Sequence, residues 1–224
     1  MTGIGPLIAD PQFALRLRMR APAAQKPASL LVLLHGVGGN ETNLVELAAD
    51  VAADTLVVFP RGPLQLGQEQ FAWFRVAFTA SGPQPDLHEA EQSRQLLIHC
   101  IEQLQAQYAI EPRRTTIAGF SQGGIMSASV ALTAPERVAA FAVLCGRILP
   151  EIESDIADPA RLSSLRAFIG HGQYDTKLPV FWAERSDAWL NRLGVAHVAR
   201  IYATGHELGE EMRSDFLRWL NHDA

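Results

Sequence analysis

The chain has 224 residues, of which 48% are hydrophobic and 19% are charged, and its formal net charge is -5 at pH 7. These values are ordinary for a soluble globular protein and argue against a disordered chain. The negative charge argues against nucleic acid or an anionic membrane as the main partner. The length suits a single domain, residues 1–224, that buries most of the surface its unfolded chain would expose.

The first ten residues, Met1–Asp10, lack the basic start and the apolar stretch of a signal peptide. No segment approaches the length of a membrane span. The two cysteines, Cys100 and Cys145, do not describe a disulfide framework in a chain of this size. We therefore expect buried thiols, a cytoplasmic location and no integral membrane association.

Short apolar runs alternate with longer segments of helical periodicity along the chain. The first segment, Phe13–Arg20, alternates apolar and basic residues, as an antiparallel edge strand would. The predicted strands that follow are Leu30–Leu34, Leu56–Phe59, Thr115–Ala118, Ala139–Leu144, Leu165–Ile169 and Ala196–Tyr202. The predicted helices are Thr42–Ala52, Leu87–Tyr108, Gly123–Ala134, Val180–Leu193 and Glu210–Leu220. We expect Asp86 to cap the longest helix and Glu89 to return the contact of a capping box.

Buried strands separated by helices predict an α/β fold, with a mostly parallel central sheet and helices on both of its faces. Ligand sites in such sheets gather beyond the carboxyl ends of the strands. The loops found there are His35–Asn40, Arg61–Pro63, Gly119–Gly123, Gly146–Arg147, Gly170–Asp175 and Ala203–Glu207. We therefore expect these loops to supply the functional residues.

One of these loops, Gly119–Gly123, reads Gly-Phe-Ser-Gln-Gly and matches the G-x-S-x-G pattern of a nucleophilic serine. It stands between a predicted strand and a helix of small and apolar residues, which is the context that gives the pattern its meaning. The tight turn is expected to strain the serine backbone, and the two glycines leave room for strand and helix to approach closely. A chance match, with Ser121 as a helix N-cap, is the alternative.

A serine hydroxyl needs a neutral base to take its proton, and histidine titrates in the right range. Because the base follows the nucleophile and the acid along the chain in this kind of fold, His206 is favoured among the seven histidines. A surface histidine that caps the next helix is the alternative. The acid holds the imidazole in its useful tautomer. Asp175 is favoured for that part, with Asp155 and Asp158 as competitors.

The predicted strand Leu30–Leu34 runs directly into His35-Gly36-Val37-Gly38-Gly39, where glycines let a backbone amide point at developing negative charge. We expect the backbone N–H groups of Val37 and of Gln122, the residue after the nucleophile, to form an oxyanion hole. His35 is expected to hold the loop and not to react. An ordinary glycine-rich turn is the alternative, and a phosphate-binding loop is disfavoured because no lysine follows the glycines.

With these segments in place, the chain resembles the phospholipase/carboxylesterase family, which includes bacterial carboxylesterases and acyl-protein thioesterases. The matching segments are Leu33–Asn40, Pro60–Pro63, Ala72–Phe74, Ala118–Ser127, Gly170–Asp175 and Gly205–Glu207. The resemblance implies an α/β-hydrolase without a large cap domain that needs no cofactor. It supports Ser121, Asp175 and His206 as a catalytic triad. Arg75 stands where many thioesterase-type members carry an aspartate, which favours the bacterial carboxylesterase-like branch.

Apolar walls suit the acyl part of a neutral ester. The residues expected to line this pocket, with core packing as the alternative for each, are Trp73, Phe74, Leu149 and Phe181. Two arginines, Arg75 and Arg147, are expected either to meet a carboxylate on the substrate or to lie solvated at the surface.

These observations predict a monomeric or homodimeric serine carboxylesterase that hydrolyses short- to medium-chain esters through an acyl-enzyme intermediate. Its expected partner is a small-molecule ester or thioester. The nearest alternative is an acyl-protein thioesterase or lysophospholipase-type hydrolase. An alternative of another class is a binding protein that kept the fold and lost catalysis, and the intact set of predicted site residues counts against it.

Overall fold

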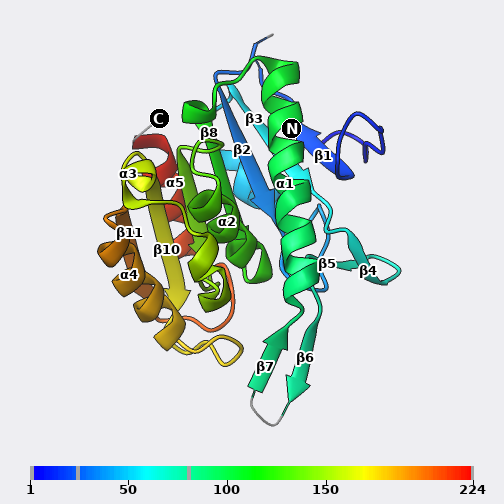
Figure 1. Ribbon diagram of the computed structural model, residues 1–224. Helices are drawn as coiled ribbons and strands as arrows, with labels where there is room; N and C mark the ends of the chain where they lie inside the picture. Colours follow the sequence, from blue (N-terminus) through cyan, green and yellow to red (C-terminus); the bar gives the residue numbers. More distant parts are fainter. Residues whose placement is uncertain (1–2, 24–25, 80–81, 223–224) are drawn as a thin grey trace.

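The computed structural model describes residues 3–23, 26–79 and 82–222. A seven-stranded sheet runs through the molecule in the order β1-β3-β2-β8-β9-β10-β11 (Figure 1). Its first strand, β1 (Leu17–Arg20), pairs antiparallel with β3 (Thr55–Pro60), and every other neighbouring pair is parallel. The predicted mostly parallel sheet with an antiparallel edge strand is therefore confirmed, although this strand begins at Leu17 and not at Phe13.

The remaining strands follow the predicted apolar runs with small shifts at their ends. They are β2 (Ser29–Leu34), β8 (Thr115–Phe120), β9 (Ala140–Leu144), β10 (Arg166–Gly172) and β11 (Ala196–Tyr202). The strands inside the sheet are buried along nearly their whole length because helices cover both faces. The edge strand β11 is mostly exposed, which explains its partial alternation of polar and apolar residues.

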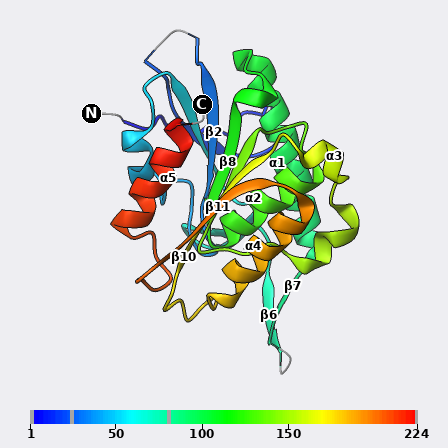
Figure 2. The ribbon, with the colours of Figure 1, turned by 90° about the vertical axis from the view of Figure 1, so that its left-hand side faces the viewer.

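The main helices are α1 (Leu87–Tyr108), α2 (Gln122–Thr133), α4 (Phe181–Leu193) and α5 (Glu210–His222). Figure 2 shows α5 on one face of the sheet and the other three on the opposite face. Shorter helical segments are η1 (Glu46–Asp50), η2 (Pro112–Arg114), η3 (Pro150–Asp155) and α3 (Pro159–Leu162). None of the helices in the described ranges is long and apolar enough to cross a membrane.

The predicted helix Thr42–Ala52 is wrong, because turns over residues 41–45 lead into the short 3-10 helix η1. Two asparagines bond to the backbone there. Asn40 Oδ1 accepts the Thr42 N–H at 2.9 Å, and Asn43 Oδ1 accepts the Asn40 N–H at 2.5 Å. Short polar side chains that satisfy nearby backbone groups compete with an α-helix.

Only one of the two contacts of the predicted capping box forms at the start of α1. Asp86 Oδ1 accepts the Glu89 N–H at 3.0 Å, which confirms the N-cap. The Glu89 carboxylate does not return the capping-box contact, because it accepts the Arg75 N–H at 2.8 Å and pairs with the Arg75 guanidinium at 2.9 Å. Long-range pairing with Arg75 thus replaces the local contact.

Two hairpins that the sequence pattern did not predict follow β3. They are β4 (Leu64–Gly67) with β5 (Gln70–Ala72), and β6 (Val76–Thr79) with β7 (Gly82–Pro85). Figure 1 shows the second hairpin extending beyond the end of the sheet toward which β10 points. Between β9 and β10 the chain forms only η3 and α3, so no helical cap covers this end in the described residues.

Candidate active site

Ser121 occupies the turn between β8 and α2, at the carboxyl end of the sheet. Its backbone has φ 53° and ψ −117°, a conformation that residues other than glycine rarely adopt. A Cβ on Gly119 would lie 2.2 Å from the carbonyl carbon of Gly123, and a Cβ on Gly123 would lie 2.2 Å from Leu34 O. The predicted strain of the serine and the need for both glycines are confirmed.

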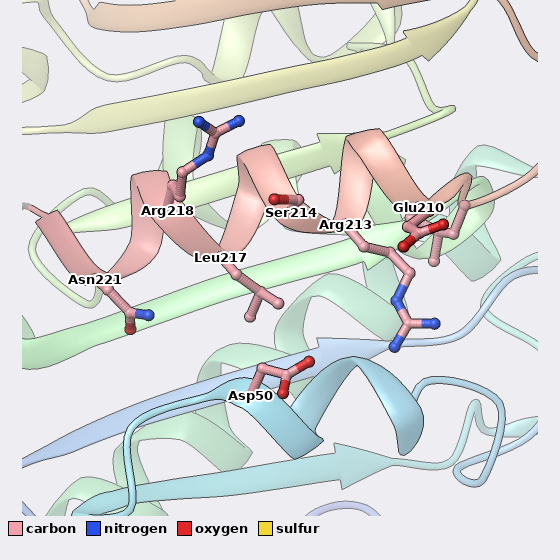
Figure 3. A pocket seen from close by; sticks show the side chains of 8 residues that line it. Asp50, Glu210, Arg213, Ser214, Leu217, Arg218 and Asn221 are labelled. Carbon is pink, nitrogen blue, oxygen red and sulfur yellow. The ribbon is translucent and has the colours of Figure 1, made fainter.

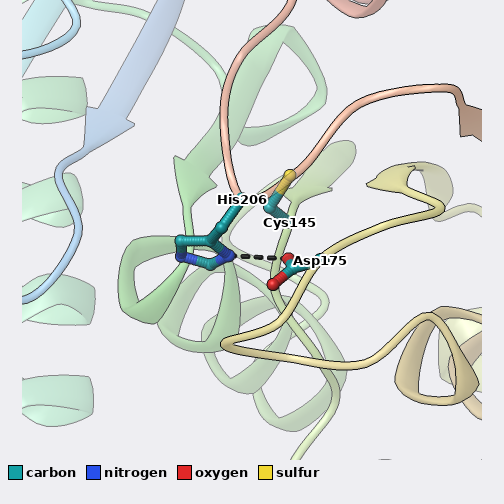
Figure 4. Close-up of side chains that lie close together, drawn as sticks. All are labelled: Cys145, Asp175 and His206. Carbon is teal, nitrogen blue, oxygen red and sulfur yellow. Dashed lines mark hydrogen bonds and ion pairs between the residues drawn. The ribbon is translucent and has the colours of Figure 1, made fainter.

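Ser121, His206 and Asp175 come from three separate loops and form one hydrogen-bonded chain. His206 Nε2 lies 2.9 Å from Ser121 Oγ, and His206 Nδ1 lies 2.6 Å from Asp175 Oδ2. Figure 4 shows the imidazole and the carboxylate facing each other across the second contact. Because a carboxylate only accepts hydrogen bonds, Nδ1 carries the proton and Nε2 is free to accept the serine O–H.

The Asp175 carboxylate is buried and held from two sides. Its Oδ1 accepts the backbone N–H groups of Lys177 and Leu178, each at 2.8 Å. Burial by itself would raise the pKa of Asp175, but the hydrogen bonds from His206 and from the two amides lower that pKa below its ordinary value. The group is therefore ionised at neutral pH.

The two competing carboxylates lie elsewhere. Asp155 ends η3 and Asp158 precedes α3, and both are exposed. Neither forms a hydrogen bond or an ion pair with His206 within the described part of the chain. Of the acids considered from the sequence, only Asp175 meets His206.

Sequence reasoning missed a second histidine at Asp175. His171, on β10, is fully buried, and its Nε2 lies 2.7 Å from Leu178 O and 3.3 Å from Asp175 Oδ2. The carbonyl oxygen accepts from Nε2–H, so His171 braces the loop that carries Asp175. The i, i+4 spacing of the two residues at the end of a strand was the available signal.

The backbone N–H groups of Val37 and Gln122 have no hydrogen-bond partner among the described residues. Their neighbours are engaged, since Gly38 N–H donates to Phe71 O at 2.8 Å and Gly39 N–H to Gly36 O at 3.1 Å. Gln122 is the first residue of α2, where N–H groups lack an intrahelical partner and the helix dipole favours negative charge. Both predicted donors are thus available to a ligand.

His35 holds the Val37 loop, as predicted. Its ring is buried, Nδ1–H donates to Gly36 O at 2.7 Å, and Nε2 accepts the Gly62 N–H at 2.9 Å. Burial lowers the pKa of His35, which keeps the ring neutral and able to accept from Gly62. The Trp73 indole N–H donates to His35 O at 2.9 Å.

Three of the residues expected in an acyl pocket lie in the core instead. The exposed fractions of Trp73, Phe74 and Leu149 are 0%, 2% and 2%, and all three belong to one hydrophobic cluster. The indole of Trp73 is buried because its N–H finds a carbonyl partner in the interior. Phe181, at the start of α4, is 56% exposed and is the one member of the set that is open to solvent.

Sequence reasoning missed an ion-pair cluster around the buried Glu41, which lies next to the Gly62 turn. Glu41 accepts from Arg61 Nε at 2.6 Å and Nη2 at 2.8 Å, and from Arg18 Nε at 3.1 Å. Burial would raise the pKa of Glu41, but these hydrogen bonds lower it to about 2. The cluster joins the edge strand to the loop after β3, whose Gly62 in turn holds His35.

Cys145 lies beside the His206–Asp175 pair, and ligand atoms of the three residues fall within 4.8 Å of one another (Figure 4). A metal ion would need a thiolate and an imidazole nitrogen without its proton. Burial raises the pKa of the Cys145 thiol to about 11, its Sγ donates to Glu207 O at 3.4 Å, and His206 Nδ1 donates to Asp175. These donors suit a hydrogen-bonded triad and not a metal site.

A hollow of the described surface lies away from this chemistry. It has a volume of about 660 Å³ and lies along α5 (Figure 3). Its lining residues are Asp50, Leu208, Glu210, Arg213, Ser214, Leu217, Arg218 and Asn221. None of the triad residues lines this hollow. Its lining carries both acidic and basic side chains, so its charge does not indicate one class of ligand.

A mostly parallel sheet, a strained serine between strand and helix, and a histidine hydrogen-bonded to that serine define the class of α/β-hydrolases. A family model described as Phospholipase/Carboxylesterase matches residues 20–222. The chain therefore belongs to the phospholipase/carboxylesterase family, and the protein is a serine hydrolase.

The similar proteins include both an acyl-protein thioesterase and carboxylesterases. The chain is 26% identical to "Acyl-protein thioesterase 1" of Emericella nidulans over 79% of its own length and 82% of that protein. It is similar to the crystal structure of a carboxylesterase from Mesorhizobium loti, with 25% identity, a TM-score of 0.82 and coverage of 97% and 98% of the two chains. The structure of esterase PE8 is also similar, with 27% identity, a TM-score of 0.81 and coverage of 92% and 97%.

Proposed function

We propose that the protein is a single-domain carboxylesterase that hydrolyses short- to medium-chain carboxylic esters, with Ser121 as nucleophile, His206 as general base and Asp175 as its orienting acid. The observation that carries the proposal is the unbroken line of hydrogen bonds from Asp175 Oδ2 through the imidazole to Ser121 Oγ. Nucleophile, base and orienting group within hydrogen-bond reach are what covalent acyl transfer requires.

In the first half of the reaction, Ser121 Oγ bonds to the ester carbonyl carbon while His206 Nε2 takes the hydroxyl proton. The carbonyl oxygen becomes negative and accepts from the N–H groups of Val37 and Gln122, which stabilise it at the start of α2. The bond from carbon to the alcohol oxygen then breaks, and the departing oxygen takes the proton from His206. An acyl ester of Ser121 remains.

In the second half, His206 removes a proton from water, whose oxygen bonds to the same carbonyl carbon. The bond to Ser121 Oγ breaks, and His206 returns the proton to that oxygen. The products are the free carboxylic acid and the restored serine. Asp175 stabilises the imidazolium in both halves without taking its proton.

The surroundings of the triad support a small and accessible ester. Only η3 and α3 stand between β9 and β10, and the exposed apolar side chains of Val37, Tyr174 and Phe181 follow the carboxyl ends of strands. Exposed apolar residues at the mouth of a site suit a modest acyl chain. Relatives named carboxylesterase and esterase agree with this choice.

The test is a kinetic panel of 4-nitrophenyl acetate, butyrate and octanoate with the matching thioesters, on wild type and Ser121→Ala. We expect Ser121→Ala to lower kcat by at least about 10⁴-fold and to prevent labelling by a fluorophosphonate. The exposed Ser163→Ala variant is the control and retains both properties. Full activity of Ser121→Ala would refute the nucleophile. A kcat/KM for thioesters far above that for the matched esters would assign a thioesterase instead.

A further inference from the structure

Arg147 is a buried cation without a hydrogen-bond or ion-pair partner among the described residues. It follows β9, is only 8% exposed, and its guanidinium forms no hydrogen bond or ion pair with any residue that the structure describes. Its Nε is buried and unpaired, as is the Nε of Arg20, whereas its two Nη atoms are not fully buried. Burying an uncompensated charge is costly, so a protein that keeps one in the interior requires a reason.

The other buried arginine shows what a structural role demands. Arg20 is 5% exposed, and its guanidinium is surrounded by carbonyl oxygens at 2.6 to 3.2 Å. These oxygens belong to Ala48, Val51, Ala52 and Thr55. Arg20 fastens the chain around β3 through these bonds. The nitrogens of Arg147 form no such bonds within the part of the chain that the structure describes.

The Arg147 guanidinium is held in place by stacking. Its central carbon lies 4.3 Å from the centre of the Trp182 ring, in the first turn of α4. Stacking on an aromatic face fixes the plane of a guanidinium and leaves its edge of N–H donors available. The nearest charges oppose each other, because Glu151 raises and Arg185 lowers the pKa of Arg147, which burial lowers most. Among the described residues, no ion pair within 4.0 Å joins Glu151 to Arg147.

The two residues just before Arg147 contact loops of the triad. A Cβ on Gly146 would lie 2.9 Å from Ser121 O, so the preceding residue touches the nucleophile turn. The residue before that, Cys145, contacts the His206 loop through Glu207 O. Trp182 follows the loop that carries Asp175. The Arg147–Trp182 contact therefore joins the segment after β9, which touches the nucleophile turn, to the first turn of α4.

We infer that Arg147 is a specificity-determining residue that binds a second carboxylate on the substrate, so that the preferred substrates are carboxylic esters that also carry a free carboxylate. The inference rests on the proposed function and narrows its substrate class. A planar guanidinium matches a carboxylate with two parallel N–H donors, and a buried position strengthens the contact. Monoesters of dicarboxylic acids have this chemistry.

The test compares matched esters that differ only in charge. We suggest 4-nitrophenyl hydrogen glutarate against its methyl ester for the acyl side, and 4-acetoxybenzoate against its methyl ester for the leaving-group side. The measured quantity is the ratio of kcat/KM for the charged ester to that for the neutral one. We expect wild type to favour the charged member of at least one pair, and Arg147→Met to lower that ratio by about 10- to 100-fold.

Arg185→Met is the matched control, because Arg185 also lies over the Trp182 ring, at 5.5 Å, but is exposed. This variant is expected to keep the wild-type ratio. Arg147→Lys keeps the charge but loses the planar guanidinium. Its ratio of kcat/KM for the charged and neutral esters is expected to lie between those of wild type and Arg147→Met. No charge preference in wild type, or the same ratio in Arg147→Met, would overturn the inference while hydrolysis of neutral esters left the proposed function intact.

Direct binding separates this inference from catalysis. Calorimetry with glutarate is expected to show binding to wild type and to Arg185→Met, and binding at least about tenfold weaker to Arg147→Met. Equal binding of glutarate to wild type and Arg147→Met, or no binding to either, overturns the inference whatever the activity. Inorganic phosphate is the second probe, and preferential binding of phosphate would overturn the assignment to a carboxylate.

Discussion

The side chain of Gln122 is hydrogen-bonded to the backbone of Trp73. Its Oε1 accepts the Trp73 N–H at 2.8 Å, and its Nε2 donates to Phe74 O at 2.7 Å. The indole of Trp73 in turn donates to His35 O, at the head of the loop that presents Val37. The two backbone amides proposed to bind the oxyanion are therefore positioned by one connected network, although Val37 and Gln122 lie 85 positions apart in the sequence.

Replacing Gln122 with alanine is expected to damage both stability and activity. The change leaves the buried N–H of Trp73 and the buried C=O of Phe74 without partners, which costs about 1–3 kcal/mol for each group. We expect urea unfolding to show a loss of about 2–5 kcal/mol, together with a lower kcat. The exposed Gln92→Ala variant of α1 is the control. A Gln122→Ala protein as stable as wild type would contradict this network.

Replacing Asp175 with asparagine is expected to lower kcat by about 10³- to 10⁴-fold with little change in KM. The amide removes the charge that stabilises the imidazolium and permits the wrong imidazole tautomer. Steady-state hydrolysis of 4-nitrophenyl butyrate measures the effect. Asp155→Asn, which alters the exposed competing carboxylate, is expected to behave as wild type. If the two variants exchanged these behaviours, the acid would have been assigned to the wrong residue.

Glu41→Gln is expected to destabilise the protein in a pH-dependent way. The folded-state pKa of Glu41 is lowered to about 2, below its ordinary value of 4.5, so its contribution is present above about pH 4.5 and is lost as the pH falls toward 2. Near pH 7 we expect the variant to lose about 3 kcal/mol of unfolding free energy, because Arg61, whose side chain is only 12% exposed, loses its charged partner.

Chemical denaturation of wild type and Glu41→Gln between pH 7 and pH 3 checks this expectation. The difference between their unfolding free energies should become smaller as the pH falls. Glu69→Gln is the matched control, since Glu69 lies 3.8 Å from the same Arg61 but its side chain is 69% exposed. A gap that stayed constant with pH would show that the charge of Glu41 is not what stabilises the cluster.

The two buried arginines are expected to respond oppositely to methionine. Arg147→Met removes an unpaired buried charge and keeps the contact with Trp182, so its Tm should equal or exceed that of wild type. Arg20→Met strands several buried carbonyl groups and should lose at least about 3 kcal/mol. Thermal unfolding of both variants decides the matter. A large fall in the Tm of Arg147→Met would show that Arg147 stabilises the fold, contrary to this expectation.

The sequence alone was sufficient for features whose signals are local. Apolar runs and helical periodicity located every parallel strand of the sheet, and the G-x-S-x-G pattern located the turn at Ser121, because glycine spacing and strand-to-helix succession are encoded within a few residues. Chain order then favoured His206 as the base, and the turn after the predicted strand Leu165–Ile169 favoured Asp175 as the acid. The same local logic failed at Thr42–Ala52, where helical periodicity was outweighed by asparagine side chains bonding to the backbone.

Only the tertiary structure decided how distant residues are used. Trp73 and Phe74 are as apolar in the sequence as a pocket wall would be, and their burial depends on Gln122 and His35, which lie far away in the chain. Arg75 and Arg147 are the same residue type, yet Arg75 pairs with Glu89 at the surface, while Arg147 is buried against Trp182 and has no ion-pair partner among the described residues. The residue type determines which interactions a side chain can form. Its burial and its partners depend on long-range contacts, and these determine its role in the protein.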